Sequence, residues 1–158
     1  MLALKKYKKK NIAIYGMGLT GRSAAKIFKK SKIKTYCWDD SEEVRKKLKF
    51  KKIKLDKFWL SKFEVDYIIL SPGINIDTCK IKKYIKKNFN KIITDIDLFI
   101  DLNKNAKFIS ITGTNGKSTT CKIIEKILKT AGHKVKTVGN IGSPILSSNN
   151  KKKNIFLS

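Results

Sequence analysis

Cysteine, proline, histidine and arginine are scarce in this sequence of 158 residues, which contains three, two, one and two of them respectively. The three cysteines include no CxxC pair, which argues against a disulfide framework and against a zinc site. Few prolines and 41% hydrophobic residues favour a folded globular chain over disorder. No apolar run approaches the roughly 20 residues of a membrane span, and no signal-peptide segment opens the chain. We therefore expect a reduced, cytoplasmic protein.

Acidic residues are also few, so the formal net charge is +25 at pH 7. Only Arg22 and Arg45 among the 37 basic residues are arginines, and the lysines are spread along the whole chain. A nucleic-acid interface usually concentrates arginine beside stacking aromatic residues. We therefore expect a solvated lysine surface with no nucleic-acid and no membrane partner. Polyanion binding is the alternative, and a steep loss of affinity with salt would reveal it.

The first half of the chain reads as alternating strands and helices. Asn11–Tyr15 is a short apolar run that stops at Gly16, as a buried parallel strand does before a turn into a helix. A helix is expected over Gly21–Lys30 and a second strand over Lys34–Trp38. Further expected elements are a strand over 65–70, a short helix over 80–89, a strand over 91–94 and a helix over 95–102.

The second half repeats this alternation. Strands are expected over Phe108–Thr112, Lys134–Val138 and Asn154–Leu157, and a helix over Ser118–Ala131. We predict an α/β fold, in which a Rossmann-like parallel-sheet domain over 1–97 is followed by the start of a P-loop ATPase domain over 98–158. The second domain is expected to be incomplete, because these elements make too small a core for a nucleotide-hydrolysing domain.

The first glycine-rich loop lies between an expected strand and helix. Residues 16–21 read GMGLTG and fit GxGxxG, in which glycines allow a tight turn and the close approach of a pyrophosphate to the helix N-terminus. Asp39 lies 23 residues after Gly16, near where an acidic group contacts a ribose in this fold. Taken alone, the loop indicates NAD. A tight turn without a ligand is the alternative.

The second loop is the stronger signal. Residues 112–119 read TGTNGKST, between an expected strand and an amphipathic helix. In such a loop the backbone amides surround phosphates, Lys117 reaches the β and γ phosphates, and the Ser118 hydroxyl ligates Mg²⁺. Ile111 stands where GxxxxGK[ST] has its first glycine, so the loop is a shorter variant that begins at Gly113.

The TGTNGKST run resembles the ATP loop of the Mur ligase family. Four further segments occur in order and at suitable spacing: GMGLTG at 16–21, SPGI at 71–74, DIDLF at 95–99 and GNIG at 139–142. Together they resemble the branch of the family that adds D-glutamate. Asp97 stands where the family often has glutamate, which leaves the role of this residue open.

The resemblance implies a monomeric, ATP-dependent ligase that joins D-glutamate to UDP-N-acetylmuramoyl-L-alanine through an acyl phosphate, with ATP and Mg²⁺ as cofactors. Lys117 would be the catalytic residue and Ser118 the metal ligand. The implied ATP-binding residues are Gly113, Thr114, Asn115, Gly116, Lys117, Ser118, Thr119 and Thr120, and the implied UDP-substrate residues are Leu19, Thr20, Asp39, Asp40, Gly73 and Asn140.

Several groups that the family uses would lie beyond Ser158, among them an acidic metal ligand, a histidine, a modified lysine and an amino-acid-binding domain. The sole histidine, His133, is expected to be a solvent-facing turn residue. We therefore expect a truncated reading frame or fragment that is inactive alone. Another amide ligase of the family and a non-catalytic NAD-binding module remain as alternatives.

Overall fold

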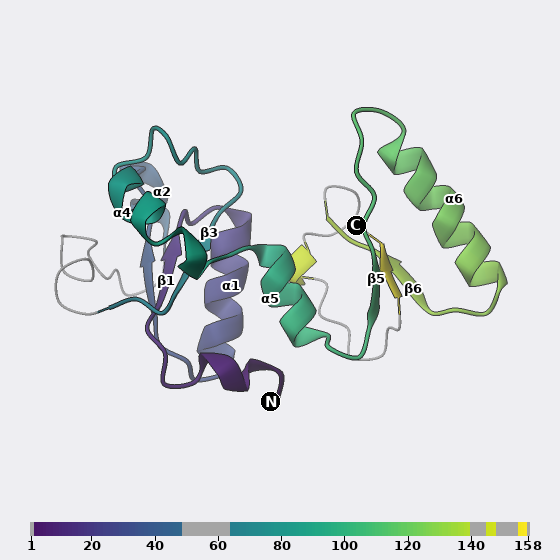
Figure 1. The fold of residues 1–158 in the computed structure, drawn as a ribbon, viewed down its shortest axis with the longest axis horizontal. Coiled ribbons are helices and arrows are strands. Elements are labelled where there is room, and N and C mark those ends of the chain that lie inside the picture. The colour runs from purple at the N-terminus through teal and green to yellow at the C-terminus, as the bar shows by residue number, and fades with distance from the viewer. Residues whose placement is uncertain (1, 49–63, 140–144, 148–154, 158) are drawn as a thin grey trace. The chain divides into compact units, whose positions relative to one another are not determined.

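The computed structural model describes residues 2–48, 64–139, 145–147 and 155–157. The chain divides into two compact units, which we call unit 1 (1–98) and unit 2 (99–158). The division falls within helix α5 (Asp95–Leu102). Both units consist of parallel strands and helices, so the predicted α/β class is confirmed (Figure 1).

Unit 1 is built on a parallel sheet of four strands in the order β2-β1-β3-β4. The strands are β1 (Ile12–Tyr15), β2 (Thr35–Trp38), β3 (Tyr67–Leu70) and β4 (Ile92–Ile93). Because the chain passes from β2 to the other side of β1, the carboxyl ends of β1 and β3 form a topological switch point, the place where such sheets bind ligands. The first glycine loop and the SPGI turn both begin at this point.

Helix α1 (Leu19–Lys30) packs on this sheet and follows β1 in the chain (Figure 1). Its buried residues, Gly21, Ala24, Ala25 and Phe28, recur on one face, while its lysines face water. The residues of β1 are fully buried, as expected for a strand covered on both faces. The helix α4 (Lys82–Lys87) buries Ile85 against Ala13, Val65 and Ile68, which belong to the same core.

In the described part of unit 1, an N-terminal 3-10 segment and a helix after β2 were not expected. A 3-10 segment, η1 (Leu2–Tyr7), buries Tyr7 completely, with its ring edge-on to Phe28 and Tyr67. Helix α2 (Glu42–Lys47) begins after Ser41, whose side chain accepts a hydrogen bond from the Val44 N–H. That cap satisfies one of the backbone donors that a helix N-terminus leaves unpaired.

Unit 2 contains a parallel sheet of three strands in the order β5-β7-β6. The strands are β5 (Lys107–Ile109), β6 (Val135–Thr137) and β7 (Ile155–Leu157). Helix α6 (Lys117–Thr130) packs Ile124 and Leu128 against Val135 and Ile155. The neighbouring residues Ile123 and Ile127 are exposed on the same helix. Gly132 follows α6 with φ +81°, which matches its expected role as a C-terminal cap, and His133 is exposed as expected.

Asp97 has a structural role at the start of α5. Its carboxylate accepts hydrogen bonds from the N–H and the hydroxyl of Thr94, and the Asp97 N–H donates to the same hydroxyl. This reciprocal arrangement is a capping box. The aspartate side chain, which is one methylene shorter than glutamate, is therefore long enough to cap this helix. The two short 3-10 segments η2 (Phe89–Lys91) and η3 (Ile145–Ser147) complete the described elements.

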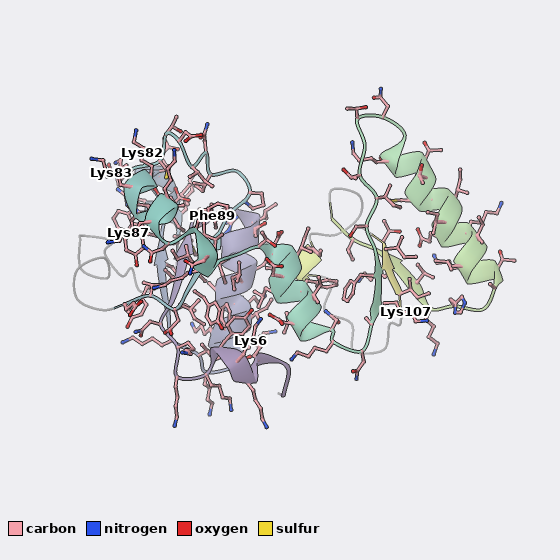
Figure 2. The ribbon with its side chains drawn as sticks, viewed as in Figure 1. Lys6, Lys82, Lys83, Lys87, Phe89 and Lys107 are labelled. Atoms are coloured by element: carbon pink, nitrogen blue, oxygen red, sulfur yellow. The ribbon has the colours of Figure 1, made fainter. Side chains whose placement is uncertain are left out.

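The lysines do not gather on one element. Figure 2 labels three of them on α4, one on η1 and one on β5, and the basic side chains project from many parts of the described surface. Within the described part of the chain, no helix is long and apolar enough to cross a membrane. Cys37, Cys79 and Cys121 are free cysteines.

Candidate functional site

The first glycine loop packs too closely for side chains at two of its positions. Gly16 has φ +90°, and a Cβ built there would lie 2.7 Å from the Ser71 Cβ. A Cβ at Gly21 would lie 1.9 Å from the Gly16 carbonyl oxygen. Gly18, by contrast, faces open space. The first and third glycines therefore serve the turn and the packing of α1, while the second leaves room beside the loop.

Hydrogen bonds from two neighbouring strand ends hold this loop. The buried Ser71 hydroxyl donates to the Gly16 carbonyl at 3.0 Å, and the Ser71 N–H continues the β1-β3 ladder to the Tyr15 carbonyl. On the other side, the Asp39 carboxylate accepts from the Met17 N–H at 2.7 Å. Met17 is itself buried. The loop is thus held in one conformation by the ends of β2 and β3.

Asp39 and Asp40, both predicted to contact the UDP substrate, are already hydrogen bonded within the chain. The second Asp39 oxygen accepts from the Ser41 N–H at 2.9 Å. Asp40 accepts from the Tyr15 hydroxyl, the Trp38 indole N–H and the Lys80 N–H. Burial raises the pKa of Tyr15 above its ordinary value and the bond to Asp40 raises it further, so the hydroxyl stays protonated and donates.

Arg45 lies behind these two acidic residues and was not identified from the sequence. Its Nη1 donates to the carbonyl oxygens of Asp39 and Asp40 at 2.7 and 2.8 Å, and its guanidinium lies over the Trp38 ring at 4.5 Å. The available signal was the rarity of arginine, whose guanidinium is a planar group with several donors, unlike the compact ammonium of lysine.

The phosphate loop of unit 2 is open to solvent. Every residue from Thr112 to Thr120 is exposed. Gly113 has φ +155° and Gly116 has φ +76°, the latter in the left-handed region immediately before α6. The Thr120 N–H makes the first helical bond, to the Gly116 carbonyl, so the earlier N–H groups of α6 lie at its free N-terminus. These donors and the helix dipole favour an anion there.

Lys117 points back over its own loop. Its Nζ donates to the Gly113 and Thr114 carbonyls, the latter at 3.2 Å. The ammonium is therefore held beside the loop backbone that would receive phosphates. Ser118, the next residue, is exposed in the first turn of α6, where its hydroxyl is accessible to a metal ion. These two groups fit a magnesium nucleotide. The Lys117 ammonium would contact its phosphates, and the Ser118 hydroxyl would ligate its magnesium ion.

A carboxylate that could join Ser118 as a metal ligand is not part of the described site. Within the described residues, no group of three histidine, cysteine or acidic side chains could hold a metal ion. Glu125, on α6, is engaged elsewhere, since its carboxylate accepts from Thr137 at 2.8 Å and pairs with Lys129 at 2.6 Å. These contacts, the Lys129 bond first, lower the pKa of Glu125.

The remaining predicted residues fall at the switch point of unit 1 or outside the described chain. Leu19 and Thr20 form the first turn of α1, and Leu19 is 66% exposed. Gly73 is exposed in the turn after β3. Asn140 lies outside the described residues. The structure therefore brings Leu19, Thr20, Asp39, Asp40 and Gly73 to one edge of the sheet in unit 1, while the phosphate loop belongs to unit 2.

Comparison with known proteins identifies this arrangement of two loops. Residues 10–93 match the family described as "Mur ligase MurD-like, N-terminal domain", and residues 111–157 match "Mur ligase middle domain". The first match alone covers more than half of the chain. The chain belongs to the Mur ligase family.

Its relatives include proteins named UDP-N-acetylmuramoylalanine--D-glutamate ligase. The one from Wolbachia pipientis wMel is 41% identical over 152 residues, which are 92% of this chain and 29% of the relative. The one from Rickettsia prowazekii is 40% identical over 90% of this chain and 32% of its own length. A Buchnera aphidicola relative, from the Schizaphis graminum subspecies, is 38% identical over 94% of this chain and 34% of its own length. The chain thus spans about a third of the length of these relatives.

Proposed function

We propose that the chain forms the UDP-substrate-binding domain and the beginning of the ATP-binding domain of a ligase that adds D-glutamate to UDP-N-acetylmuramoyl-L-alanine. The observation that carries the proposal is the phosphate loop of unit 2, together with relatives whose names state this reaction. ATP with Mg²⁺ would transfer its γ-phosphoryl group to the L-alanine carboxylate, which leaves ADP and an acyl phosphate. The amine of D-glutamate would then attack this acyl phosphate, form the amide bond and release phosphate.

In unit 2, Lys117 and the free N–H groups at the start of α6 are the positive groups of this proposal. Lys117 would exchange its contacts with the Gly113 and Thr114 carbonyls for phosphate oxygens. From there it would offset the negative charge that develops on the transferred phosphoryl group. Ser118 would ligate the magnesium ion, and residues 113–120 would surround the phosphates.

In unit 1, the switch point would hold the UDP end of the substrate. The open space at Gly18 allows a diphosphate to approach the loop, and the N-terminus of α1 favours its charge. The proposal assigns Leu19 and Thr20, in the first turn of α1, and Gly73, in the turn after β3, to the same site. The proposal assigns Asp39 and Asp40 to the same site and expects a uridine nucleotide there in place of NAD. It places the reaction in the cytoplasm.

Loss of the Lys117 ammonium tests the ATP assignment. We expect Lys117→Ala to weaken binding of a fluorescent ATP analogue with Mg²⁺ by about tenfold or more, because a charge-assisted contact to phosphate is lost. The matched control is Lys122→Ala, which removes an exposed lysine from the same helix outside the loop. Unchanged nucleotide affinity in Lys117→Ala would contradict the assignment.

Titration with UDP and with NADH tests the substrate of unit 1. We expect saturable binding of UDP, followed by calorimetry, and no saturable change in NADH fluorescence. The opposite pattern would favour a dinucleotide-binding module. Binding of a polyanion whose affinity falls steeply as the salt concentration rises, and with which UDP does not compete, would instead indicate a polyanion partner.

A further inference from the structure

Arg45, on the short helix α2, contacts the residues at the end of β2 through both hydrogen bonds and its position over an aromatic ring. One nitrogen, Nη1, donates to two successive carbonyls, those of Asp39 and Asp40, and the guanidinium carbon Cζ lies over the Trp38 ring, 4.5 Å from its centroid. Trp38, Asp39 and Asp40 are consecutive residues at the end of β2. Arg45 therefore fixes the backbone of the whole turn between β2 and α2.

The turn between β2 and α2 also helps to determine the conformation of the first glycine loop. The Asp39 carboxylate uses one oxygen on the Met17 N–H and the other on the Ser41 N–H. Its position thus depends on the Asp39 backbone, which Arg45 holds. A continuous series of contacts runs from Arg45 through Asp39 to Met17, the residue between the first two glycines of the loop.

An arginine suits this combination of contacts better than a lysine. A guanidinium is planar, so it stacks on an indole while its amino groups donate in the same plane, whereas an ammonium is a compact and strongly hydrated charge. The chain has 37 basic residues and only two arginines. One of them is the residue that donates to two carbonyls of the turn and also lies over the Trp38 ring.

We propose that Arg45 is a positioning residue for the diphosphate of a uridine nucleotide at the first glycine loop. It acts through Asp39, which keeps the Met17 N–H turned inward and the loop shaped around the open side of Gly18. This inference rests on the proposed substrate of unit 1. It gives Asp39 a role in shaping the loop, in addition to any contact with the ligand.

Arg45→Lys tests this inference while keeping the charge. Two quantities are measured in the 158-residue chain, namely the dissociation constant for UDP and the hydrogen-exchange rate of the Met17 amide by NMR. We expect UDP binding to weaken by about tenfold, since hydrogen bonds made by a charged group are lost. The Met17 amide should exchange faster, while the amides of Ile14 and Ile69, in the buried strands, keep their protection. Lys46→Gln, the next residue on α2, should change neither quantity.

Two results in Arg45→Lys would overturn the inference. One is a UDP affinity equal to that of the wild type. The other is a uniform loss of protection at Met17, Ile14 and Ile69, which would show general destabilisation of unit 1. If the wild-type chain does not bind UDP, the proposed substrate fails. The exchange rate of the Met17 amide then tests the role of Arg45 without UDP. Faster exchange at that amide alone would still support the proposal that Arg45 positions the loop, and unchanged exchange would overturn it.

Discussion

The two glycine loops of this chain differ in how much of the protein holds them. In unit 1, Ser71 and Asp39 reach the loop from neighbouring strand ends, and Gly16 and Gly21 fit where no side chain fits. In unit 2, residues 112–120 are all exposed, and the polar contacts described for the loop come from its own Lys117. The first loop is therefore shaped before any ligand arrives, while the second is shaped mainly by its own backbone.

This difference follows from what surrounds each loop. The loop of unit 1 has a parallel strand on both sides of β1, and the side chains at their ends supply hydrogen bonds. In unit 2, β5 has one described neighbour, β7, and the hydrogen bonds described for the loop after β5 are made within the loop itself. Substitutions in the first loop should accordingly affect the folding of a whole unit, and those in the second should remain local.

The largest effect is expected for Gly21→Ala. Its methyl group would lie 1.9 Å from the Gly16 carbonyl oxygen, so α1 must move off the sheet, at a cost of about 3 kcal/mol or more in the free energy of unfolding. Trp38 lies in β2, so denaturation followed by tryptophan fluorescence reports on unit 1. Gly18→Ala, in the same loop but facing open space, serves as the control and should be nearly neutral. Equal stability of the two variants would contradict the prediction that close packing of the loop at Gly21 supports the folding of unit 1.

A smaller effect is expected for Gly116→Ala in the phosphate loop. A Cβ there meets nothing within 4 Å, so the cost comes only from the left-handed backbone at φ +76°, about 1–2 kcal/mol. Amide hydrogen exchange should increase around the start of α6 and leave β1 and β3 unchanged. Loss of protection in unit 1 would show that the second loop is not independent of the first unit.

The smallest effect is expected from the Glu125 carboxylate, which joins α6 to β6 beyond the loop. Its pKa is lowered in the folded state by Lys129 and Thr137, so its contribution is present above the unfolded pKa and is lost as the pH falls through the folded pKa. We expect the wild type to lose up to about 1 kcal/mol of stability in unit 2 below about pH 4, a loss that Glu125→Gln should not show. Amide exchange of β6 against pH measures it, and identical profiles would contradict the expectation.

Most elements could be predicted from the sequence because they depend on local patterns. Apolar runs that end at glycine indicated β1 and β5, and helical spacing indicated α1 and α6. Spacing did not reveal which apolar residues of α6 face the sheet, since Ile123 and Ile127 share the pattern with Ile124 and Leu128 but are exposed. That distinction depends on where the sheet lies.

The parts that could not be predicted depend on contacts between distant residues. Segment η1 contains one aromatic residue, Tyr7, which is buried only because Phe28 and Tyr67 surround it. Helix α2 did carry a readable signal, a serine followed by two glutamates, which is typical of a helix start. At the site, an acidic residue at the end of β2 was identified, but no pattern shows that its oxygens meet the Met17 and Ser41 N–H groups. Its contact with the UDP substrate stays a prediction.

The order of strands in the two sheets also determines when each unit can fold during synthesis. The sheet of unit 1 has all four of its strands once Ile93 has been made. Among the described strands of unit 2, β5 and β6 both pair with β7, so neither has this partner until Ile155–Leu157 has been made. Because parallel pairing over such a separation is slow and domains fold from the N-terminus onward, the phosphate loop and α6 leave the ribosome before the sheet that supports them exists.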